Sequence, residues 1–501
     1  MSRKAMLLSF LGGFLSLSIE VIWIRLFTFY TASIPQAFSF TLSLFLVGIA
    51  LGAFIGKRVC QEGKASVHYI GYIFIIAAFF DCLAILFLIW LTGSASPGST
   101  VFLLAVGVFS CALVRGIVFP IVHHLGSEGK KTGAAISNVY FANVLGCTLA
   151  PIFIGFYLLD LFTTQQTYFV VILITLIVAC FCVKQSVLKV ATSSLAIAAL
   201  GCIFLPEKLI HSLSQKEDVA LEEVIENKHG FIQVYKNSQD DRLVFGSNVY
   251  DGTLNVDLIN NSNMIDRAYL LPMLAPQAKH ILVIGLSTGS WVDVLTTMPE
   301  LESITVIELN PAYVQLANRY SEMDNILKDK RVRIITDDGR RWLSRNTDKT
   351  FDFILMNTTF HWRSYATNLL SQEFLELTKS RLNPNGFIYF NTTGSMDAFY
   401  TSKSVYPYVY KYKNMSLAAL TPIEKISREK VASALQTMQW RHNGEYVFNT
   451  EDKLRQGVDK MLEYPIVGYH DIDFSPLKRA PEIITDKNMI TEYKYGIFSF
   501  E

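Results

Sequence analysis

No cysteine follows Cys202 in this 501-residue chain, and no excess of charge of either sign is present. Lys and Arg number 44 against 43 Asp and Glu, which gives a formal net charge of +1. A chain this close to neutrality lacks the electrostatic footprint of a nucleic-acid binder, so we predict no nucleic-acid partner. Internal repeats and low-complexity linkers are also lacking. Their absence excludes repeat architectures and leaves an ordinary chain of more than one domain.

The cysteines that are present lie at or within apolar runs. They are Cys60, Cys82, Cys111, Cys147, Cys180, Cys182 and Cys202. The closest pair, Cys180 and Cys182, has neither the spacing of zinc ligands nor histidines nearby. We interpret the cysteines as small apolar packing residues and predict neither disulfides nor a metal site.

Long apolar runs occupy the first two hundred residues and account for the high hydrophobic content of 51%. About 20 such residues suffice for one membrane crossing. The runs cover 5–30, 38–56, 69–92, 101–122, 133–159, 166–183 and, more weakly, 190–205. We therefore predict that residues 1–206 form an all-α transmembrane bundle of six to seven spans, as in a multi-pass protein of a bacterial inner membrane. The first run is too long, and too closely followed by others, to be a cleaved signal peptide.

Positive residues alternate between the loops and predict the orientation of the spans. They are Arg3, Lys4, Lys57, Arg58, Lys64, Lys130, Lys131, Lys184 and Lys189. The positive-inside rule then places the amino terminus in the cytoplasm. Seven crossings would put the second half of the chain outside, whereas six would keep it cytoplasmic. Because the segment 190–205 is short and rich in Ala and Ser, it can lie in the membrane interface, and we favour a cytoplasmic second half.

Two further patterns mark the apolar part. Gly48, Gly52 and Gly56 recur every four residues, which predicts a helix face that a neighbouring helix approaches closely. Ionisable residues inside the runs are Glu20, Arg25, Asp81 and Arg115. An unpaired charge is costly there, so these four predict either internal ion pairs or a polar cavity, with Asn138 and Asn143 as further candidates for its wall.

From about residue 220 the sequence changes to charged, alternating segments. Residues 218–260 alternate apolar and polar positions around a polar turn at 237–241, which predicts a small antiparallel hairpin or meander. Over 261–400, strand and helix patterns then alternate and predict a doubly wound, mainly parallel sheet. We expect residues 401–501 to complete this sheet and to add an appendage.

The segment HILVIGLSTGSW, followed by ITVIELNP, predicts where this sheet binds a ligand. Gly285 and Gly289 permit a tight turn at which the backbone approaches a ligand closely. Glu308 ends the next strand, where an acid accepts hydrogen bonds from both ribose hydroxyls. The pattern is typical of a Rossmann-type nucleoside site.

The order of these elements resembles the spermidine synthase family of polyamine aminopropyltransferases over roughly 220–395, with DDGRRWL and SQEFLELTKSRLNPNG in place. The whole chain looks like the membrane-fused bacterial members of that family. The resemblance implies a transmembrane helical bundle followed by an α/β Rossmann-like domain with a small β subdomain. It also implies that Glu308 binds ribose and that Asp338 contacts adenine, with Asp337 and Gly339 beside it.

Other positions depart from the family pattern. Gly285-Leu286-Ser287-Thr288-Gly289-Ser290 replaces Gly-Gly-Gly-Asp-Gly-Gly, so Thr288 stands where the family has the acid that holds the donor's primary amine. Asn357-Thr358-Thr359-Phe360-His361 replaces Asp-Ser-Ser-Asp-Pro, so both acids of that loop are missing. The family's glutamine before the turn has no clear counterpart in Tyr250-Asp251-Gly252-Thr253-Leu254.

These departures leave the proton acceptor open. Transfer from a sulfonium needs an unprotonated amine and a nearby base, and asparagine at 357 does not serve as one. We predict that His361 is the base or a substrate anchor, with Asn357, Arg363 and Tyr365 alongside. The alternative is a rigid loop whose aromatic residues only close over the nucleoside. Tyr250, Asp251, Asp257 and Asp266 are candidates for binding the amine, or are ordinary loop and cap residues.

Three functions are compatible with these residues. The first is transfer of an aminopropyl group from decarboxylated S-adenosylmethionine to an amine such as putrescine. The second is methyl or aminocarboxypropyl transfer from S-adenosylmethionine to a small or lipidic acceptor, because an acid at position 288 would repel a donor with an α-carboxylate and Thr288 does not. The third is non-catalytic binding of a nucleoside or polyamine at the membrane. The sequence leaves the oligomeric state open, a homo-oligomer included.

Overall fold

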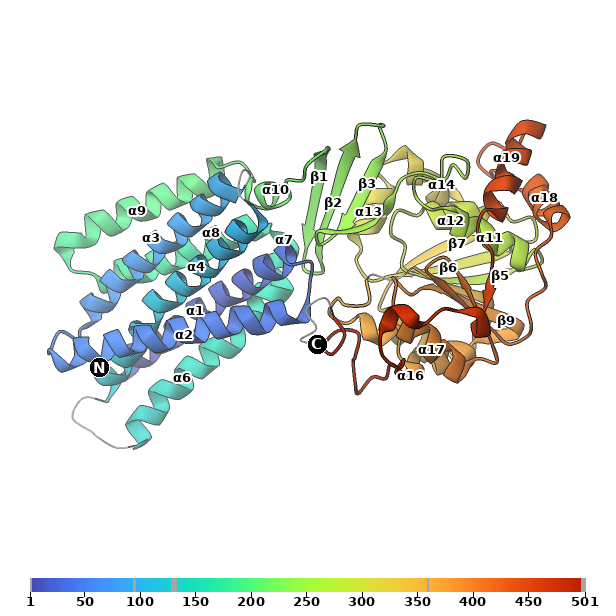
Figure 1. The fold of residues 1–501 in the computed structure, drawn as a ribbon. Coiled ribbons are helices and arrows are strands. Elements are labelled where there is room, and N and C mark those ends of the chain that lie inside the picture. The colour runs from blue at the N-terminus through green and yellow to red at the C-terminus, as the bar shows by residue number, and fades with distance from the viewer. Residues whose placement is uncertain (1, 93–95, 128–132, 358–359, 497–501) are drawn as a thin grey trace. The chain divides into compact units, whose positions relative to one another are not determined.

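The structure is a computed structural model that describes residues 2–92, 96–127, 133–357 and 360–496 (Figure 1). Thr358 and Thr359 of the loop discussed above lie outside the described residues. Contacts divide the chain into two compact units. The first, the helical unit, comprises residues 1–217 and 223–233, and the second, the α/β unit, comprises 218–222 and 234–501.

The helical unit contains the long apolar helices. Its elements are α1 (Ser2–Tyr30), α2 (Pro35–Gln61), α3 (Val67–Leu91), α4 (Pro97–Gly116), α5 (Val118–Gly126), α6 (Gly133–Ile152), the π-helix Phe153–Leu158, α7 (Leu159–Leu161), α8 (Thr164–Cys182), α9 (Gln185–Phe204) and α10 (Leu209–Leu213). Among the described residues, six helical segments are long and apolar enough to cross a membrane. The segment α9 is a helix but is not one of the six.

The glycine stripe of α2 packs directly on α4, as its spacing predicted. A Cβ added at Gly48 would lie 2.8 Å from the Cβ of Ala112, and one at Gly52 would lie 2.1 Å from the carbonyl oxygen of Leu113. No side chain fits at these distances. The glycines are therefore what lets the two helix backbones come together.

Two of the four ionisable residues in the apolar runs form an internal ion pair. Arg115 donates from Nη1 to Asp81 Oδ1 over 2.8 Å, its Nη2 contacts Asp81 Oδ2, and both side chains are buried. Arg25 instead donates to the Thr164 hydroxyl over 3.0 Å and lies 4.2 Å from the ring centre of Phe231. Among the described residues, Glu20 has neither an ion-pair partner nor a hydrogen-bond donor, and it lines a cavity.

Two sheets follow the helices. Strands β1 (Val219–Asn227), β2 (Gly230–Asn237), β3 (Arg242–Gly246) and β4 (Val249–Thr253) form a four-stranded sheet in that order. The turn between β2 and β3 is built on Asn237, whose Oδ1 accepts hydrogen bonds from the backbone N–H groups of Gln239 and Asp241. This is the polar turn at which the sequence predicted a hairpin or meander.

The second sheet has eight strands in the order β12-β10-β11-β9-β8-β5-β6-β7. Its strands are β5 (His280–Ile284), β6 (Ser303–Glu308), β7 (Val332–Thr336), β8 (Phe351–Met356), β9 (Leu382–Asn391), β10 (Tyr408–Tyr412), β11 (Met415–Ala419) and β12 (Val467–Gly468). Strands β5 to β9 pair in parallel, and β9 to β12 pair antiparallel. The expected mainly parallel sheet is confirmed, and residues after 401 add three of its strands.

Helices connect the strands of this sheet. They are α11 (Asp266–Leu274), α12 (Ser290–Thr296), α13 (Ala312–Ala317), α14 (Ser321–Lys328), α15 (Gly339–Arg345), α16 (Gln372–Lys379), α17 (Met396–Val405), α18 (Arg428–Thr437) and α19 (Glu451–Leu462). Strand β5 lies between β6 and β8, so the chain leaves β5 toward β6 and β7 and later returns to its other side as β8. Open α/β sheets bind ligands at such a reversal, outside the carboxyl ends of the strands.

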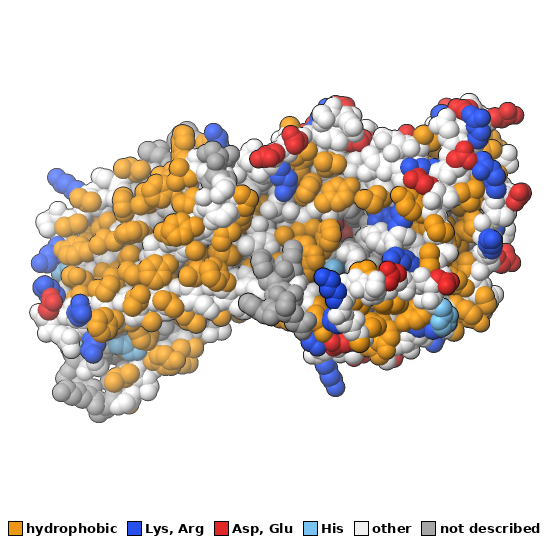
Figure 2. All heavy atoms as spheres, viewed as in Figure 1, with side chains coloured by type: hydrophobic (Ala, Val, Ile, Leu, Met, Phe, Trp, Pro, Cys, Tyr) orange, Lys and Arg blue, Asp and Glu red, His pale blue; other side chains and the backbone are white. Residues whose placement is uncertain are grey.

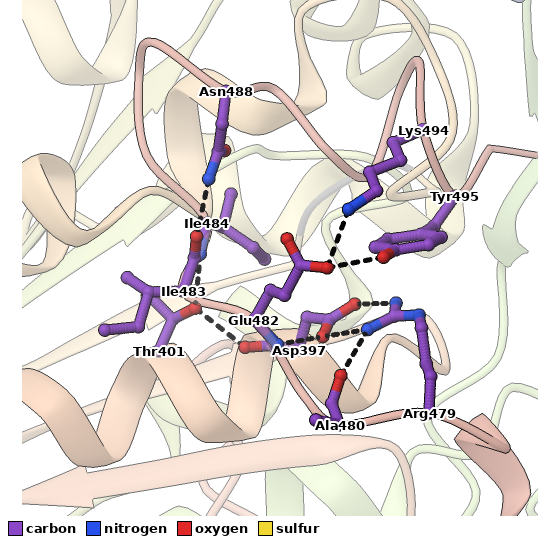
Figure 3. A network of polar contacts seen from close by, with 10 residues as sticks. All are labelled: Asp397, Thr401, Arg479, Ala480, Glu482, Ile483, Ile484, Asn488, Lys494 and Tyr495. Carbon is purple, nitrogen blue, oxygen red and sulfur yellow. Dashed lines mark hydrogen bonds and ion pairs between the residues drawn. The ribbon is translucent and has the colours of Figure 1, made fainter.

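The end of the chain is tied to α17 by polar contacts (Figure 3). Arg479 donates to both carboxylate oxygens of Asp397, over 3.0 and 2.6 Å. Glu482 accepts from Lys494 over 2.8 Å and from the Tyr495 hydroxyl over 2.5 Å. The Arg479 bonds attach this last described segment to α17, and the Glu482 bonds join two parts of the segment to each other.

Candidate functional site

The turn after β5 has the conformation that its glycines predicted. Gly285 and Gly289 have φ values of +90° and +71°, which side-chain-bearing residues rarely adopt. A Cβ at Gly285 would lie 3.1 Å from the carbonyl oxygen of Asn357, which directly follows β8. The loops after β5 and β8 therefore meet at the reversal point of the sheet.

Strand β4 packs on the same turn. Ser287 donates from its hydroxyl to the carbonyl oxygen of Asp251 over 2.9 Å. Thr288 is buried and donates to Ser290 over 3.1 Å, and Ser290 in turn donates to the carbonyl oxygen of Thr253. The Ser287 hydroxyl thus bonds directly to β4, and the Thr288 hydroxyl is linked to β4 through Ser290.

Glu308 ends β6 beside this turn and is 6% exposed. Its Oε2 accepts from the backbone N–H of Leu286 over 2.7 Å, and its Oε1 accepts from that of Asn310 over 2.8 Å. Burial raises the pKa of Glu308 to about 7, although the backbone bonds oppose that rise. The backbone N–H of Ser287 also acts on this carboxylate, which leaves part of its acceptor capacity for a ribose hydroxyl.

A second acid lies close to Glu308. The Tyr313 hydroxyl, on α13, donates to Oδ2 of Asp251. Burial raises the pKa of Asp251, while the Tyr313 bond and the positive charge of Arg363 lower it. Asp251 also acts electrostatically on Glu308. Two predicted residues, Asp251 and Arg363, are thereby brought together with Glu308.

Tyr313 was not predicted as part of this cluster. It follows the Asn310-Pro311 pair that opens α13, so its first helical turn faces the carboxyl end of β6. A tyrosine in the first turn of the helix that follows β6 was a usable signal in the sequence. Arg267 was missed as well: it is 8% exposed and its guanidinium lies 5.0 Å from the ring centre of Trp291.

Asp337 and Asp338 follow β7 and are engaged locally. Asp337 Oδ1 accepts from Nε of Arg341 over 2.7 Å. Asp338 caps α15, because its Oδ1 accepts from the backbone N–H of Arg341 over 2.7 Å. A Cβ at Gly339 would lie 2.6 Å from Cγ2 of Ile284, so the glycine lets α15 start against β5. Asp338 therefore stands at the predicted edge, with one carboxylate oxygen used by the cap.

His361 and Asn357 flank the loop after β8. The Thr393 hydroxyl accepts from the backbone N–H of His361 over 2.8 Å, lies 3.0 Å from its Nδ1 and donates to the carbonyl oxygen of Thr392. Because that proton is already used, Nδ1 is assigned as the donor and Nε2 as the free acceptor. Burial lowers the pKa of His361 below 6.5, so the ring is neutral at pH 7. Asn357 Oδ1 accepts from Asn391 over 3.2 Å.

Three other predicted residues lie apart from this cluster. Tyr365 is 77% exposed, and its backbone N–H donates to Glu492. Tyr250 is 40% exposed and shares a hydrogen bond with Thr253. Asp266 accepts from the Tyr412 hydroxyl over 2.8 Å and pairs with Lys413 over 2.6 Å. In the part of the chain that the structure describes, none of these three side chains bonds to Glu308 or His361.

Asp257 lines a different cavity of about 500 Å³, together with Tyr269, Asp293, Trp440 and Phe448. Burial raises the pKa of Asp293 to about 7. The three acidic residues predicted as candidates for binding the amine thus lie in different places. Asp251 lies at the reversal point, Asp257 lines this cavity, and Asp266 is in an ion pair. Within the described residues, no group of three or more His, Cys, Asp or Glu side chains is placed to hold a metal ion.

Comparison with known proteins shows which family this part of the chain resembles. Residues 268–419, from α11 to the end of β11, match the family model of the spermine/spermidine synthase domain. This part of the α/β unit is therefore similar to the spermine/spermidine synthase domain. The matched segment carries the β5 turn, Glu308, the Asp337-Asp338 pair and His361.

Named relatives share limited identity with the chain. A polyamine aminopropyltransferase of Oceanobacillus iheyensis is 21% identical over 76% of this chain and 75% of its own length. A probable polyamine aminopropyl transferase of Bifidobacterium longum is 27% identical, but the match covers 33% of this chain and 36% of the relative. A polyamine aminopropyltransferase of Escherichia coli is 32% identical over 23% of this chain and 41% of its own length.

Two solved structures match the chain at sequence identities of 16% and 21%. Spermidine synthase in complex with the transition state analogue AdoDATO has a TM-score of 0.37 at 16% identity, covering 49% of this chain and 88% of the other. Human methyltransferase-like protein 13 in complex with SAH has a TM-score of 0.29 at 21% identity, covering 39% and 92% of the two chains.

Proposed function

We propose that the chain is a membrane-anchored transferase that moves an aminopropyl group from decarboxylated S-adenosylmethionine to an amine such as putrescine. The observation that carries the proposal is the meeting of Glu308, Asp251 and the Gly285 turn at the point where the sheet order reverses. The family match and the names of the relatives support the same chemistry.

The donor would lie along the carboxyl ends of β5, β6 and β7. Glu308 would accept from the ribose hydroxyls, and Asp338 stands at the end of β7 for the purine. The family's acid for the donor amine is replaced by Thr288, but Asp251 supplies a carboxylate beside the same turn, since its carbonyl already bonds to Ser287. Asp251 is therefore our candidate for holding the donor's amine.

The chemical step is a displacement at the carbon next to the sulfonium. The amine nitrogen of the acceptor forms the new C–N bond, the C–S bond breaks, and its electron pair stays on the leaving thioether. The attacking nitrogen loses one proton, for which we propose His361 Nε2 as the acceptor. A neutral ring with Nδ1 fixed by Thr393 suits that role.

The membrane anchor is proposed from the helical unit. Its long helices expose large apolar side chains, such as Phe181 at 86%, Trp90 at 77% and Phe102 at 67%. Figure 2 shows hydrophobic side chains over much of this unit. Soluble proteins rarely expose such patches, whereas lipid covers them. An even number of six crossings, with α9 in the interface, would keep both chain ends on the cytoplasmic side.

One observation favours a second candidate function. Arg363 lies near Asp251, and an arginine beside a carboxylate is suited to the α-carboxylate and α-amine of intact S-adenosylmethionine. With that donor the product would be a methylated or aminocarboxypropylated small or lipidic acceptor.

Full-length protein in detergent, incubated with putrescine and each labelled donor in turn, tests both candidates by mass spectrometry of the products. Aminopropyl transfer from the decarboxylated donor alone supports the first function. Methyl or aminocarboxypropyl transfer supports the second, and binding of the decarboxylated donor without consumption contradicts the first. Changing Arg363 to Gln should weaken intact S-adenosylmethionine more than the decarboxylated donor. Arg381→Gln, a change in a distant arginine, serves as the control.

A further inference from the structure

The helical unit contains a small, partly open cavity that the transferase chemistry does not use. Its volume is about 230 Å³, below the range of drug-sized sites, so its occupant is a small molecule. Most of its wall is apolar. The lining side chains that carry the argument are Glu20, Phe45, Phe74, Arg115, Asn143 and Cys147.

Glu20 is the exceptional group in this wall. It lies within α1 and is 6% exposed. No residue that the structure describes donates a hydrogen bond to its carboxylate or pairs with it. A buried carboxylate without a partner is costly in an apolar setting, and such residues mark binding sites or paths in membrane helices.

The neighbouring polar groups do not offset the charge of Glu20. Arg115 lines the cavity, but its guanidinium is neutralised by Asp81, and only its Nε–H is left without a hydrogen-bond partner. The Asn143 side chain donates to the carbonyl oxygen of Ser9 over 3.1 Å, and its Oδ1 accepts from the Cys147 thiol over 3.7 Å. The net charge facing the cavity is therefore that of one carboxylate.

We propose that this cavity is a binding site for a small aliphatic ammonium ion. The Glu20 carboxylate would pair with the nitrogen, and the aromatic and aliphatic wall would cover the methylene groups. The apolar wall argues against a bare inorganic cation, because a hard cation needs several oxygen ligands and Glu20 supplies two. The inference stands on the helical unit alone and does not depend on turnover in the α/β unit.

The test uses full-length protein in detergent, with n-butylammonium chloride as the probe and sodium chloride at equal ionic strength as the comparison. A hydrophobic carbodiimide modifies Glu20, and peptide mass spectrometry follows the extent of labelling. At ten times the dissociation constant of the probe, we expect labelling of Glu20 to slow about tenfold, because only about a tenth of the sites stay empty. Calorimetry should show that Glu20→Gln abolishes butylammonium binding at this site.

A matched control separates the site from general effects. Glu62→Gln makes the same chemical change at an exposed glutamate of the same unit and should leave binding unchanged. Equal protection by sodium, or no protection by butylammonium, overturns the proposal, the latter leaving Glu20 as a proton-exchanging group only. If Glu20→Gln elutes as the wild-type species in size-exclusion chromatography yet binds the probe as before, the proposal is also overturned.

Discussion

The carboxylate of Glu308 accepts a hydrogen bond from the backbone N–H of Leu286 over 2.7 Å. The residue proposed to hold the ribose of the donor therefore also braces the turn against which that donor would lie. Binding and turn geometry are coupled through one side chain, and its buried position makes the coupling sensitive to ionisation.

Glu308→Gln should weaken donor binding. The amide keeps one acceptor oxygen but loses the charge, and a hydrogen bond to a charged group contributes about 1.5–3 kcal/mol. We expect a loss of about 10- to 100-fold in affinity for decarboxylated S-adenosylmethionine, measured by calorimetry at pH 8. Glu302→Gln, at an exposed glutamate paired with Lys279, should bind as the wild type does. Unchanged affinity in Glu308→Gln would remove Glu308 from the donor site.

The same substitution should change how stability depends on pH. The pKa of Glu308 is raised from 4.5 to about 7 in the folded protein. The group therefore stabilises the fold most below pH 4.5, and this contribution is lost as pH rises through 7. The loss corresponds to about 3 kcal/mol. The amide also leaves one of two buried backbone N–H groups without an acceptor, and this loss does not depend on pH. The melting temperature of Glu308→Gln minus that of the wild type should therefore rise by on the order of 5 °C between pH 5 and pH 8. A difference that falls with rising pH would contradict this account.

Protonation of His361 should cause the loss of turnover at acidic pH. Burial lowers its pKa below 6.5, so the ring is an unprotonated base at neutral pH. Turnover should fall only when pH drops below the usual range of a histidine pKa. His361→Ala should reduce kcat by about 100- to 10,000-fold and abolish that fall at acidic pH. Steady-state kinetics from pH 5 to 9 would show both. His280→Ala, at an exposed histidine that begins β5, is the control. A variant that keeps near-normal turnover would take His361 out of the mechanism.

The sequence predicted the sheet and its ligand-binding edge because those features depend on short, local sequence patterns. Buried runs such as HILVIG alternate with helices, and Gly285 and Glu308 follow strands whose carboxyl ends share one edge. Contacts between distant segments have no such signature. The pair of Asp266 with Lys413 spans 147 positions and gives a candidate amine ligand a buried partner. In the helical unit, Asn138 was predicted beside the cavity but is exposed, while Asn143 lines it.

The end of the chain should position the loop that carries His361. Glu492 is 1% exposed, and its two carboxylate oxygens accept from the backbone N–H groups of Tyr365 and Thr367 over 3.0 and 2.8 Å. Glutamine at this position has one acceptor oxygen, so one buried N–H would face an amide N–H₂ and lose its bond. We expect Glu492→Gln to lower stability by about 1–3 kcal/mol and to lower kcat more than it raises KM for the donor.

The unequal effect is expected because Glu492 bonds to the loop at Tyr365, four residues after His361. Among the described residues, Glu492 has no hydrogen bond to Glu308 or Asp338, which are proposed to bind the donor. Donor affinity by calorimetry should therefore stay within about twofold of wild type while turnover falls at least about tenfold. Glu376→Gln, at an exposed position of α16, gives the background effect of the same substitution. Parallel losses of donor affinity and turnover would mean that Glu492 supports the fold as a whole and does not position the loop.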